Sequence, residues 1–394
     1  MRKISILIVI LVWASVQTFA QILPLSDQAE ISVLNMGPGN QVYSIWGHTA
    51  IRVQDPLNGW DKVYNYGTFD FNTPNFTLKF LRGKLDYTLS VQHYYNTIAA
   101  YGNEGRWIQE QTLNLDQTEK IRLYELLEEN YKPENRLYKY DFFFDNCATR
   151  PVNIIRESIK DSITFATLPI EKSFRHILDE HLTNDSWLDF GIDLIIGARA
   201  DQIADPVQQM FMPKYVREYF GPATKGTDVK DALVVREKVV LEETKSPKKD
   251  FPFPFRPVFI FNLLLALEIL LFVFSFRKKK AYWKVYDKTW FTVAAIASVF
   301  LLFMWFGTDH LATKSNWNLW WINPLFVVVL LPVPANAKKW VFRLLAVLLI
   351  LLIASWTLIP QQLNLVFLPI ILVLILKCIR NGFTVFQDGK SQTQ

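Results

Sequence analysis

The sequence predicts an α+β domain followed by an all-α transmembrane bundle of about five helices. The composition divides the 394-residue chain into these two parts. Near residue 250, a mixture of charged, aromatic and apolar residues gives way to long apolar runs. Before that point, alternating stretches typical of strands are interspersed with stretches of helical periodicity. The length is sufficient for two domains of about 100–200 residues each.

Residues 1–20 have the organisation of a signal peptide. Arg2 and Lys3 form a basic start, residues 4–12 are apolar, and small residues precede Gln21. The alternative is an uncleaved anchor, and both interpretations place residues 21–256 outside the cytoplasm. The net charge of +5 is small and much of it flanks the apolar runs, so the composition does not indicate a nucleic-acid partner.

Residues 21–244 are expected to form the exported domain. Two strands, at 43–53 and 63–71, form a plausible antiparallel pair with His48 near one end. Asp116 and Glu119 have the spacing of a capping box. Further strands are expected at 29–36, 84–91, 106–115, 138–144 and 229–241, and helices at 74–82, 92–102, 116–130, 148–160 and through much of 170–220. A proline-rich linker at 245–256 is expected to be a short, rigid tether.

Residues 257–380 contain five apolar runs; a membrane helix needs about 20 residues, so the third and fifth runs are short for a span, and Asn323–Pro324 interrupt the third. The expected spans are 257–276, 289–306, 317–334, 340–359 and 363–379, followed by a cytoplasmic tail at 381–394. Lys and Arg clusters at 277–280, 338–343 and 377–380 fall on one side if the first span runs inward. The loop 307–318 then returns to the outer face.

Cys147 is the candidate nucleophile. It follows an aromatic run and the Asp145–Asn146 pair, both good helix caps, and precedes a helix expected at 148–160. Free N–H groups at a helix N-terminus favour a thiolate and lower the pKa of a cysteine. The other cysteine, Cys378, lies at the cytoplasmic end of an apolar run, so the two are not expected to pair.

His48 is the candidate base and Asn65 the candidate third catalytic residue. A thiol nucleophile needs a base within hydrogen-bond reach, and the base needs a polar group to orient it. Histidine precedes cysteine here, the reverse of papain-like enzymes, and a circular permutation of that fold explains the order. Asn65 has a second interpretation as a turn-end residue that bonds to backbone. Asn146 is a candidate for capping the helix or for an oxyanion hole.

Further candidates for substrate binding lie on the strand of His48 and in the outer loop. Arg52 shares a face with His48 through period-2 alternation. The loop 307–318 has more polar side chains than a turn needs, namely those of Asp309, His310, Asn316 and Asn318. The tryptophans of the same loop suit a membrane interface. Glu268 lies within the first span, as a functional or a helix-pairing carboxylate. No HExxH, P-loop or CxxC motif is present, and neither a metal nor a cofactor is expected.

Three motifs and the loop together resemble the Lnb-type lipoprotein N-acyltransferases: residues 46–52, 64–71 and 145–151, with 308–319. The exported part also resembles permuted NlpC/P60 domains of the lecithin–retinol acyltransferase type. The resemblance implies transfer of an acyl chain from a membrane lipid to the N-terminal diacylglyceryl-cysteine of a lipoprotein, carried by Cys147 and His48. It also implies a multi-pass protein of the bacterial inner membrane with the catalytic domain on the periplasmic side.

Two other classes of function remain open: a membrane-tethered cell-wall peptidase or amidase of NlpC/P60 type, and a sensor or scaffold with a silent thiol. A peptidase needs one anchor, whereas five spans with polar residues on the catalytic side suit a lipid substrate. The acyl donor, its chain length and the oligomeric state are not evident from the sequence.

Overall fold

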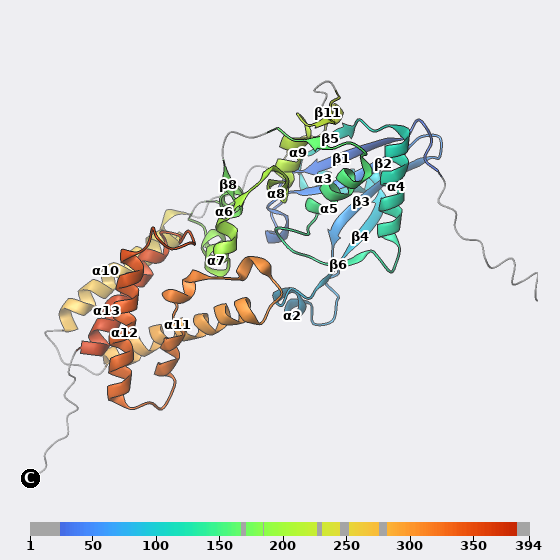
Figure 1. The fold of residues 1–394 in the computed structure, drawn as a ribbon. Coiled ribbons are helices and arrows are strands. Elements are labelled where there is room, and N and C mark those ends of the chain that lie inside the picture. The colour runs from blue at the N-terminus through green and yellow to red at the C-terminus, as the bar shows by residue number, and fades with distance from the viewer. Residues whose placement is uncertain are drawn as a thin grey trace, which may run out of the picture.

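The computed structural model describes residues 24–166, 171–183, 185–226, 231–244, 252–275 and 282–383. The expected signal peptide, most of the linker, the basic cluster at 277–280 and most of the C-terminal tail lie outside these ranges. A sheet domain is followed by a helical part (Figure 1). The predicted α+β domain with a helical C-terminal part is confirmed.

The core of the first part is a seven-stranded sheet in which every neighbouring pair is antiparallel. The strand order is β11-β5-β1-β2-β3-β4-β6. The bounds are β1 Glu30–Met36, β2 His48–Asp55, β3 Trp60–Thr68, β4 Asp86–His93, β5 Ile108–Leu113, β6 Leu137–Lys139 and β11 Val234–Leu241. The pairing of β2 with β3 is the one that the sequence predicts.

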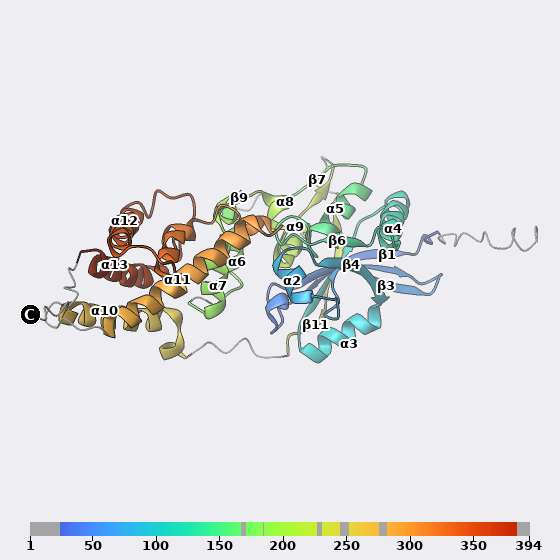
Figure 2. The same cartoon turned by 90° about the horizontal axis from the view of Figure 1, so that it is seen from below.

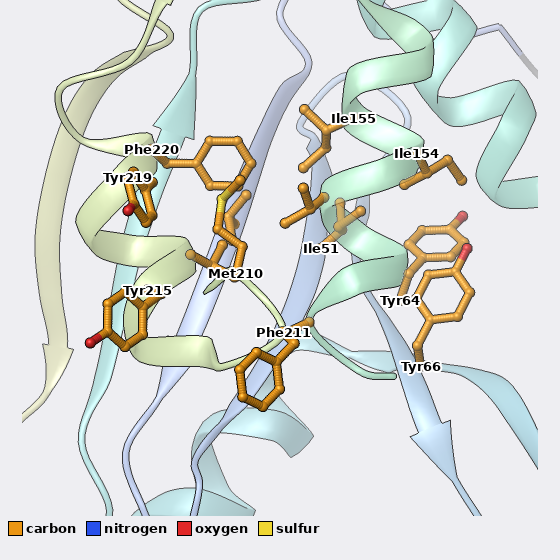
Figure 3. Close-up of a cluster of buried hydrophobic side chains, with 14 of the residues drawn as sticks. Ile51, Tyr64, Tyr66, Ile154, Ile155, Met210, Phe211, Tyr215, Tyr219 and Phe220 are labelled. Carbon is orange, nitrogen blue, oxygen red and sulfur yellow. The ribbon is translucent and has the colours of Figure 1, made fainter. Parts of the chain in front are cut away.

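Helices cover both faces of this sheet (Figure 2). On one face, α4 (Gln117–Tyr131), α5 (Thr149–Ser158) and α9 (Pro213–Phe220) enclose a large apolar core. Ile51 of β2 lies beside Ile155 of α5 within it, and Tyr64 of β3 lies beside Ile154 (Figure 3). On the other face, α3 (Tyr94–Glu104) packs over Ala50 and Val63. Successive side chains of β2 therefore point to opposite faces of the sheet and pack in two different cores, as the pleat of a strand requires.

The smaller elements of this part are α2 Phe76–Leu81, α6 Phe174–Asp179, α7 Trp187–Ile195, α8 Pro206–Gln209, η1 Val42–Ser44, η2 Ala198–Asp201 and the short pairs β7 Ile163–Thr164 with β10 Thr224–Lys225 and β8 Lys172–Ser173 with β9 Ile203–Ala204.

Two expected strands are shorter than predicted. β2 begins only at His48, since Gly47 has a φ of +81° and the preceding residues turn. β6 stops at Lys139, because the Asp141 carboxylate accepts the N–H groups of Phe143 and Phe144 in a turn. The predicted capping box at Asp116 is confirmed.

The helical part contains η3 Phe253–Phe255, α10 Pro257–Ser275, α11 Tyr282–Phe306, η4 Leu311–Thr313, η5 Trp317–Trp320, η6 Pro324–Val329, α12 Ala335–Ala354 and α13 Phe367–Phe383. Segments Pro257–Phe274 and Val285–Phe306 are long and apolar enough to cross a membrane. The prediction of a helix at 317–334 is wrong. Asn323 caps the N–H of Leu325 and Pro324 starts a new 3-10 segment, so this stretch consists of η5 and η6.

A charge cluster ties three of the long helices together. Lys377 of α13 donates to Glu268 of α10 (2.8 Å) and to Asp287 of α11 (3.0 Å), and Arg380 also pairs with both carboxylates. All four side chains are buried. Charges buried in this way are normally paired. Of the two interpretations of Glu268, helix pairing fits these contacts.

The two parts are joined by several contacts, among them Asn364 with Asp189 (3.2 Å) and Asp193 (2.8 Å), and two of the contacts bring the loop 307–318 against the first part. The loop 307–318 docks on the end of α7, where Gly197 N–H donates to the Ala312 carbonyl (2.8 Å). A β-carbon on Gly197 would lie 1.9 Å from the Lys314 carbonyl oxygen, so this approach requires glycine. The second contact joins the turn after α2 to the start of the loop, where Asp309 N–H donates to the Arg82 carbonyl (2.9 Å).

Candidate active site

Cys147 lies directly before α5, where the sequence places it. The side-chain oxygen of Asn146 accepts the backbone N–H groups of Ala148 (2.7 Å) and Thr149 (2.9 Å), which have no partner within the helix. The Asn146 amide group donates to the carbonyls of Phe142 (2.7 Å) and Phe211 (2.9 Å). These four bonds fix Asn146, and with it the position of the neighbouring Cys147 at the start of α5.

His48 and Asn65 complete the predicted constellation. His48, the first residue of β2, hydrogen-bonds to the Cys147 thiol. Its Nε2 lies 2.6 Å from Oδ1 of Asn65 on β3. An amide oxygen only accepts, so Nε2 carries a proton and Nδ1 is the nitrogen left for the sulfur. The structure therefore brings the three predicted residues together in the order thiol, imidazole, amide.

The electrostatics of this group favour a thiolate–imidazolium pair. Burial alone raises the pKa of the Cys147 thiol, but the charge of His48 and hydrogen bonds from His48, Tyr140 and the Thr49 N–H outweigh it, so the pKa is lowered. Burial lowers the pKa of His48, and the Cys147 thiolate with its hydrogen bond raises it, with a net increase. Opposite charges in contact stabilise each other in this way.

Tyr140 and Gly67 are site residues that the sequence analysis missed. The Tyr140 hydroxyl hydrogen-bonds to the Cys147 sulfur, and its ring stacks on Tyr87 at 4.5 Å between centroids. A β-carbon on Gly67 would lie 3.2 Å from the β-carbon of Cys147. Gly67 lies in the motif that contains Asn65, and Tyr140 lies in the expected strand 138–144 just before Cys147, but a glycine or a hydroxyl in an aromatic run does not by itself indicate a site.

The comparisons with known proteins agree with this organisation. The family model for the Lnb N-terminal periplasmic domain matches residues 24–180, and that for the Lnb transmembrane domain matches residues 247–388. The chain belongs to the Lnb family. No curated protein and no solved structure was found to match it. Lnb membership makes it a lipoprotein N-acyltransferase-like membrane protein with a periplasmic domain.

Two of the predicted substrate-binding residues of this Lnb domain have structural roles instead. Arg52 is 5% exposed and pairs with Asp61 (2.7 Å) and Glu110 (2.8 Å) under the ring of Tyr94. It also lies four residues from His48 along β2, about 13 Å in a strand. Asn146 uses its side chain for the cap described above. The substrate-binding assignment of Arg52 is therefore corrected. For Asn146 the predicted role in capping the helix is confirmed, and its assignment to substrate binding is corrected.

The asparagines of the outer loop are likewise structural. Asn316 donates to the carbonyls of Leu194 and Ile195 (both 2.9 Å), and Asn318 donates to Asp193 (2.8 Å) and Leu194 (3.1 Å). Both are almost completely buried. Their predicted contact with an ester or amine is therefore corrected: these side chains cap the carbonyl end of α7 and fasten the loop to it.

Asp309 and His310 have a different environment. His310 Nε2 lies 3.0 Å from the carbonyl of Phe80, and the exposed carboxylate of Asp309 lies 3.9 Å from the amine of Lys84. Both residues thus touch the periplasmic domain at the turn after α2. Among the described residues, no group of three or more His, Cys, Asp or Glu side chains is arranged to hold a metal ion.

Proposed function

We propose that this Lnb protein N-acylates the diacylglyceryl-cysteine at the N-terminus of lipoproteins through a thioester on Cys147, with His48 as base. The contact of a helix-terminal thiol with an imidazole, itself held by Asn65, is the observation that supports the proposal most strongly. The order of histidine on a strand and cysteine before a later helix also fits a permuted papain-like, NlpC/P60-type fold.

In the first step, the Cys147 thiolate attacks the acyl ester of a membrane lipid. The bond from acyl carbon to sulfur forms, and the bond from acyl carbon to the lipid oxygen breaks. His48, as imidazolium, gives its proton to the departing alcohol, so a lysolipid leaves. Asn65 keeps the imidazole oriented by accepting from Nε2.

In the second step, the free amine of the lipoprotein's N-terminal cysteine attacks the thioester. His48, now neutral, takes a proton from the amine, the amide forms, and Cys147 leaves as a thiolate. The imidazolium that results pairs again with the thiolate, which restores the starting state. No cofactor enters either step.

The placement of the two parts suits substrates that lie at a membrane surface. The protein is proposed to be a multi-pass protein of the bacterial inner membrane, with the loop 307–318 on the periplasmic side. Asp309 and His310 lie at the border between the periplasmic domain and the helices, where a lipid headgroup would lie. Headgroup contact by these two residues is part of the proposal.

Mass spectrometry of lipoprotein N-termini tests the function. Cells that depend on this protein should carry a third, amide-linked acyl chain on their lipoproteins, and cells with Cys147→Ala at equal protein level should carry two ester-linked chains only. Unchanged triacylation with Cys147→Ala would overturn the proposal. Cleavage of cell-wall peptides by the wild-type protein, without a change in lipoproteins, would favour the peptidase alternative.

A further inference from the structure

An exposed aromatic surface surrounds α2, outside the site described above. It consists of Tyr43, Phe69, Phe71, Phe76, Leu78 and Phe80, and we call it the α2 surface. Phe71 is 62% exposed, Leu78 53% and Phe80 52%. Large apolar side chains gathered at this exposure mark a contact surface rather than a core. The aromatic rings of the α2 surface pack against one another: the ring centroid of Phe71 lies 4.9 Å from that of Phe69 and 5.1 Å from that of Phe76.

The same rings lead inward to the thiol. Phe80 stacks on Phe76, at 6.2 Å, and Phe76 lies 5.8 Å from Phe69. Phe69 in turn contacts Tyr87 at 5.3 Å. Tyr87 stacks on Tyr140, whose hydroxyl bonds to Cys147. A continuous aromatic track therefore joins the exposed end of α2 to the sulfur.

The α2 surface lies beside the outer end of a membrane-crossing helix. The segment Val285–Phe306 ends at the loop whose Asp309 and His310 bond to the carbonyls of Arg82 and Phe80. In both views α2 lies near that end of α11 (Figures 1 and 2). Phe306, the last residue of α11, is 72% exposed, so the apolar surface of the helix continues toward α2.

Basic residues border the apolar ones. Lys79 lies within α2, and Arg82 and Lys84 follow it, with the Lys84 side chain 47% exposed. Aromatic residues with Lys and Arg beside them are typical of the membrane interface, where cations meet phosphates while apolar groups enter the hydrocarbon region. A protein partner would not require this surface to be level with the end of a membrane helix.

We propose that the α2 surface is immersed among the acyl chains of the outer leaflet and that its aromatic track guides one acyl chain to Cys147. The immersion is argued only from the exposure of the α2 surface and its position beside α11. The guidance of an acyl chain to Cys147 rests in addition on the proposed function. The contact holds the thiol above the ester region of the bilayer, and it requires no rearrangement of the sheet.

Spin-label accessibility tests the immersion without using activity. Leu78→Cys and Leu57→Cys are made in the full-length Cys147→Ala protein and labelled with a nitroxide; Cys378 is buried. Leu57 is a matched control, since it is a leucine 63% exposed at the hairpin between β2 and β3, at the end of β2 remote from His48. The proteins are reconstituted in vesicles of phosphatidylethanolamine and phosphatidylglycerol.

The label at 78 is expected to collide more with oxygen, which concentrates in hydrocarbon, and less with a water-soluble nickel chelate than the label at 57. Equal nickel accessibility at both positions would overturn the immersion, whether or not the protein transfers acyl chains.

A second pair of variants tests the guidance. Leu78→Asp should lower acylation of a lipoprotein by at least about tenfold, because a carboxylate is costly among acyl chains, whereas Leu57→Asp should not. Alkylation of Cys147 by a small reagent should proceed equally in both, which shows an intact site. Equal acylation by the two variants would overturn the guidance. Absence of acylation in the wild-type protein would instead refute the proposed function. The immersion would then still be decided by the spin-label measurement.

Discussion

A β-carbon on Gly67 would lie 3.2 Å from the β-carbon of Cys147, closer than most side-chain contacts, so a side chain there would press Cys147 away from β3. Gly67 also has a φ of +89°, which L side chains rarely adopt. The thiol therefore packs against bare backbone on one side, while His48 and Tyr140 bond to its sulfur.

Gly67→Ala is expected to slow both acylation and Cys147 alkylation by about tenfold or more, because the added methyl displaces the sulfur from His48. Gly59→Ala is the matched control, since Gly59 also has a positive φ, of +68°, with nothing within 4 Å of its added β-carbon. Rate measurements on both proteins separate backbone strain from crowding. Equal rates for the two variants would show that the close approach to Cys147 has no functional consequence.

The thiolate–imidazolium pair predicts a shifted pH profile. Because the pKa of Cys147 is lowered, its alkylation should continue below pH about 8.5, the ordinary value for a thiol. His48→Ala removes the opposing charge and leaves burial, which raises the pKa, so the profile should move to higher pH. Asn65→Ala should move it in the same direction by less, and Asn65→Asp, which retains an acceptor, should restore it. A pH profile of alkylation that His48→Ala leaves unchanged would show that the imidazole does not affect the pKa of the Cys147 thiol.

The junction of the two parts should respond to pH through Asp179. Burial, then the charges of Asp193 and Asp189, raises the pKa of Asp179 to about 7, against a partial opposing effect of Arg175. The folded state therefore binds this proton more tightly than the unfolded state, and stability falls as pH rises toward 7. Asp179→Asn should raise the melting temperature at pH 8 and change it little at about pH 2.5, well below the ordinary pKa of an aspartate near 3.9, where the carboxyl is protonated in both states. The exposed Asp27 provides a control, since Asp27→Asn should leave both values unchanged. Equal effects of Asp179→Asn at the two pH values would contradict the shift.

The orientation of the membrane part can be tested by labelling. In a Cys147→Ala background, a membrane-impermeant thiol reagent applied from the periplasmic side should label Asp309→Cys and not Asn336→Cys. Asp309 lies exposed beside the periplasmic domain, and Asn336 lies exposed at the start of α12, near the other end of the bundle. Labelling of position 336 alone would reverse the proposed topology.

Local chemistry explains which parts of the site were predictable. Cys147, His48 and Asn65 lie in short motifs whose strand and helix settings are read from alternation and capping residues, and the structure brings them together. Tyr140 was not identified, because the expected strand over 138–144 ends early, and the turn capped by Asp141 redirects the chain.

Polar residues with structural roles were the main source of error. Arg52, Asn316 and Asn318 all have side chains that suit a binding site, but each one satisfies a buried charge or a backbone group elsewhere in the fold. Their partners lie far away in sequence, as with Arg52 and Glu110 or Asn318 and Asp193, so one chain could not reveal them. The third apolar run is not a continuous helix for a local reason: Asn323 and Pro324 interrupt it and start a separate 3-10 segment.

The most direct test of the account is to look for the acyl chain on Cys147. The full-length protein is reconstituted with phospholipid but without lipoprotein, digested, and the peptide containing Cys147 is measured by mass spectrometry. The account predicts a mass increase equal to one fatty acyl group, removed by neutral hydroxylamine, absent in His48→Ala, and lost when a diacylated lipoprotein peptide is added. A Cys147 peptide that remains unmodified while lipoprotein is acylated at the normal rate would contradict the central claim that the chain passes through this thiol.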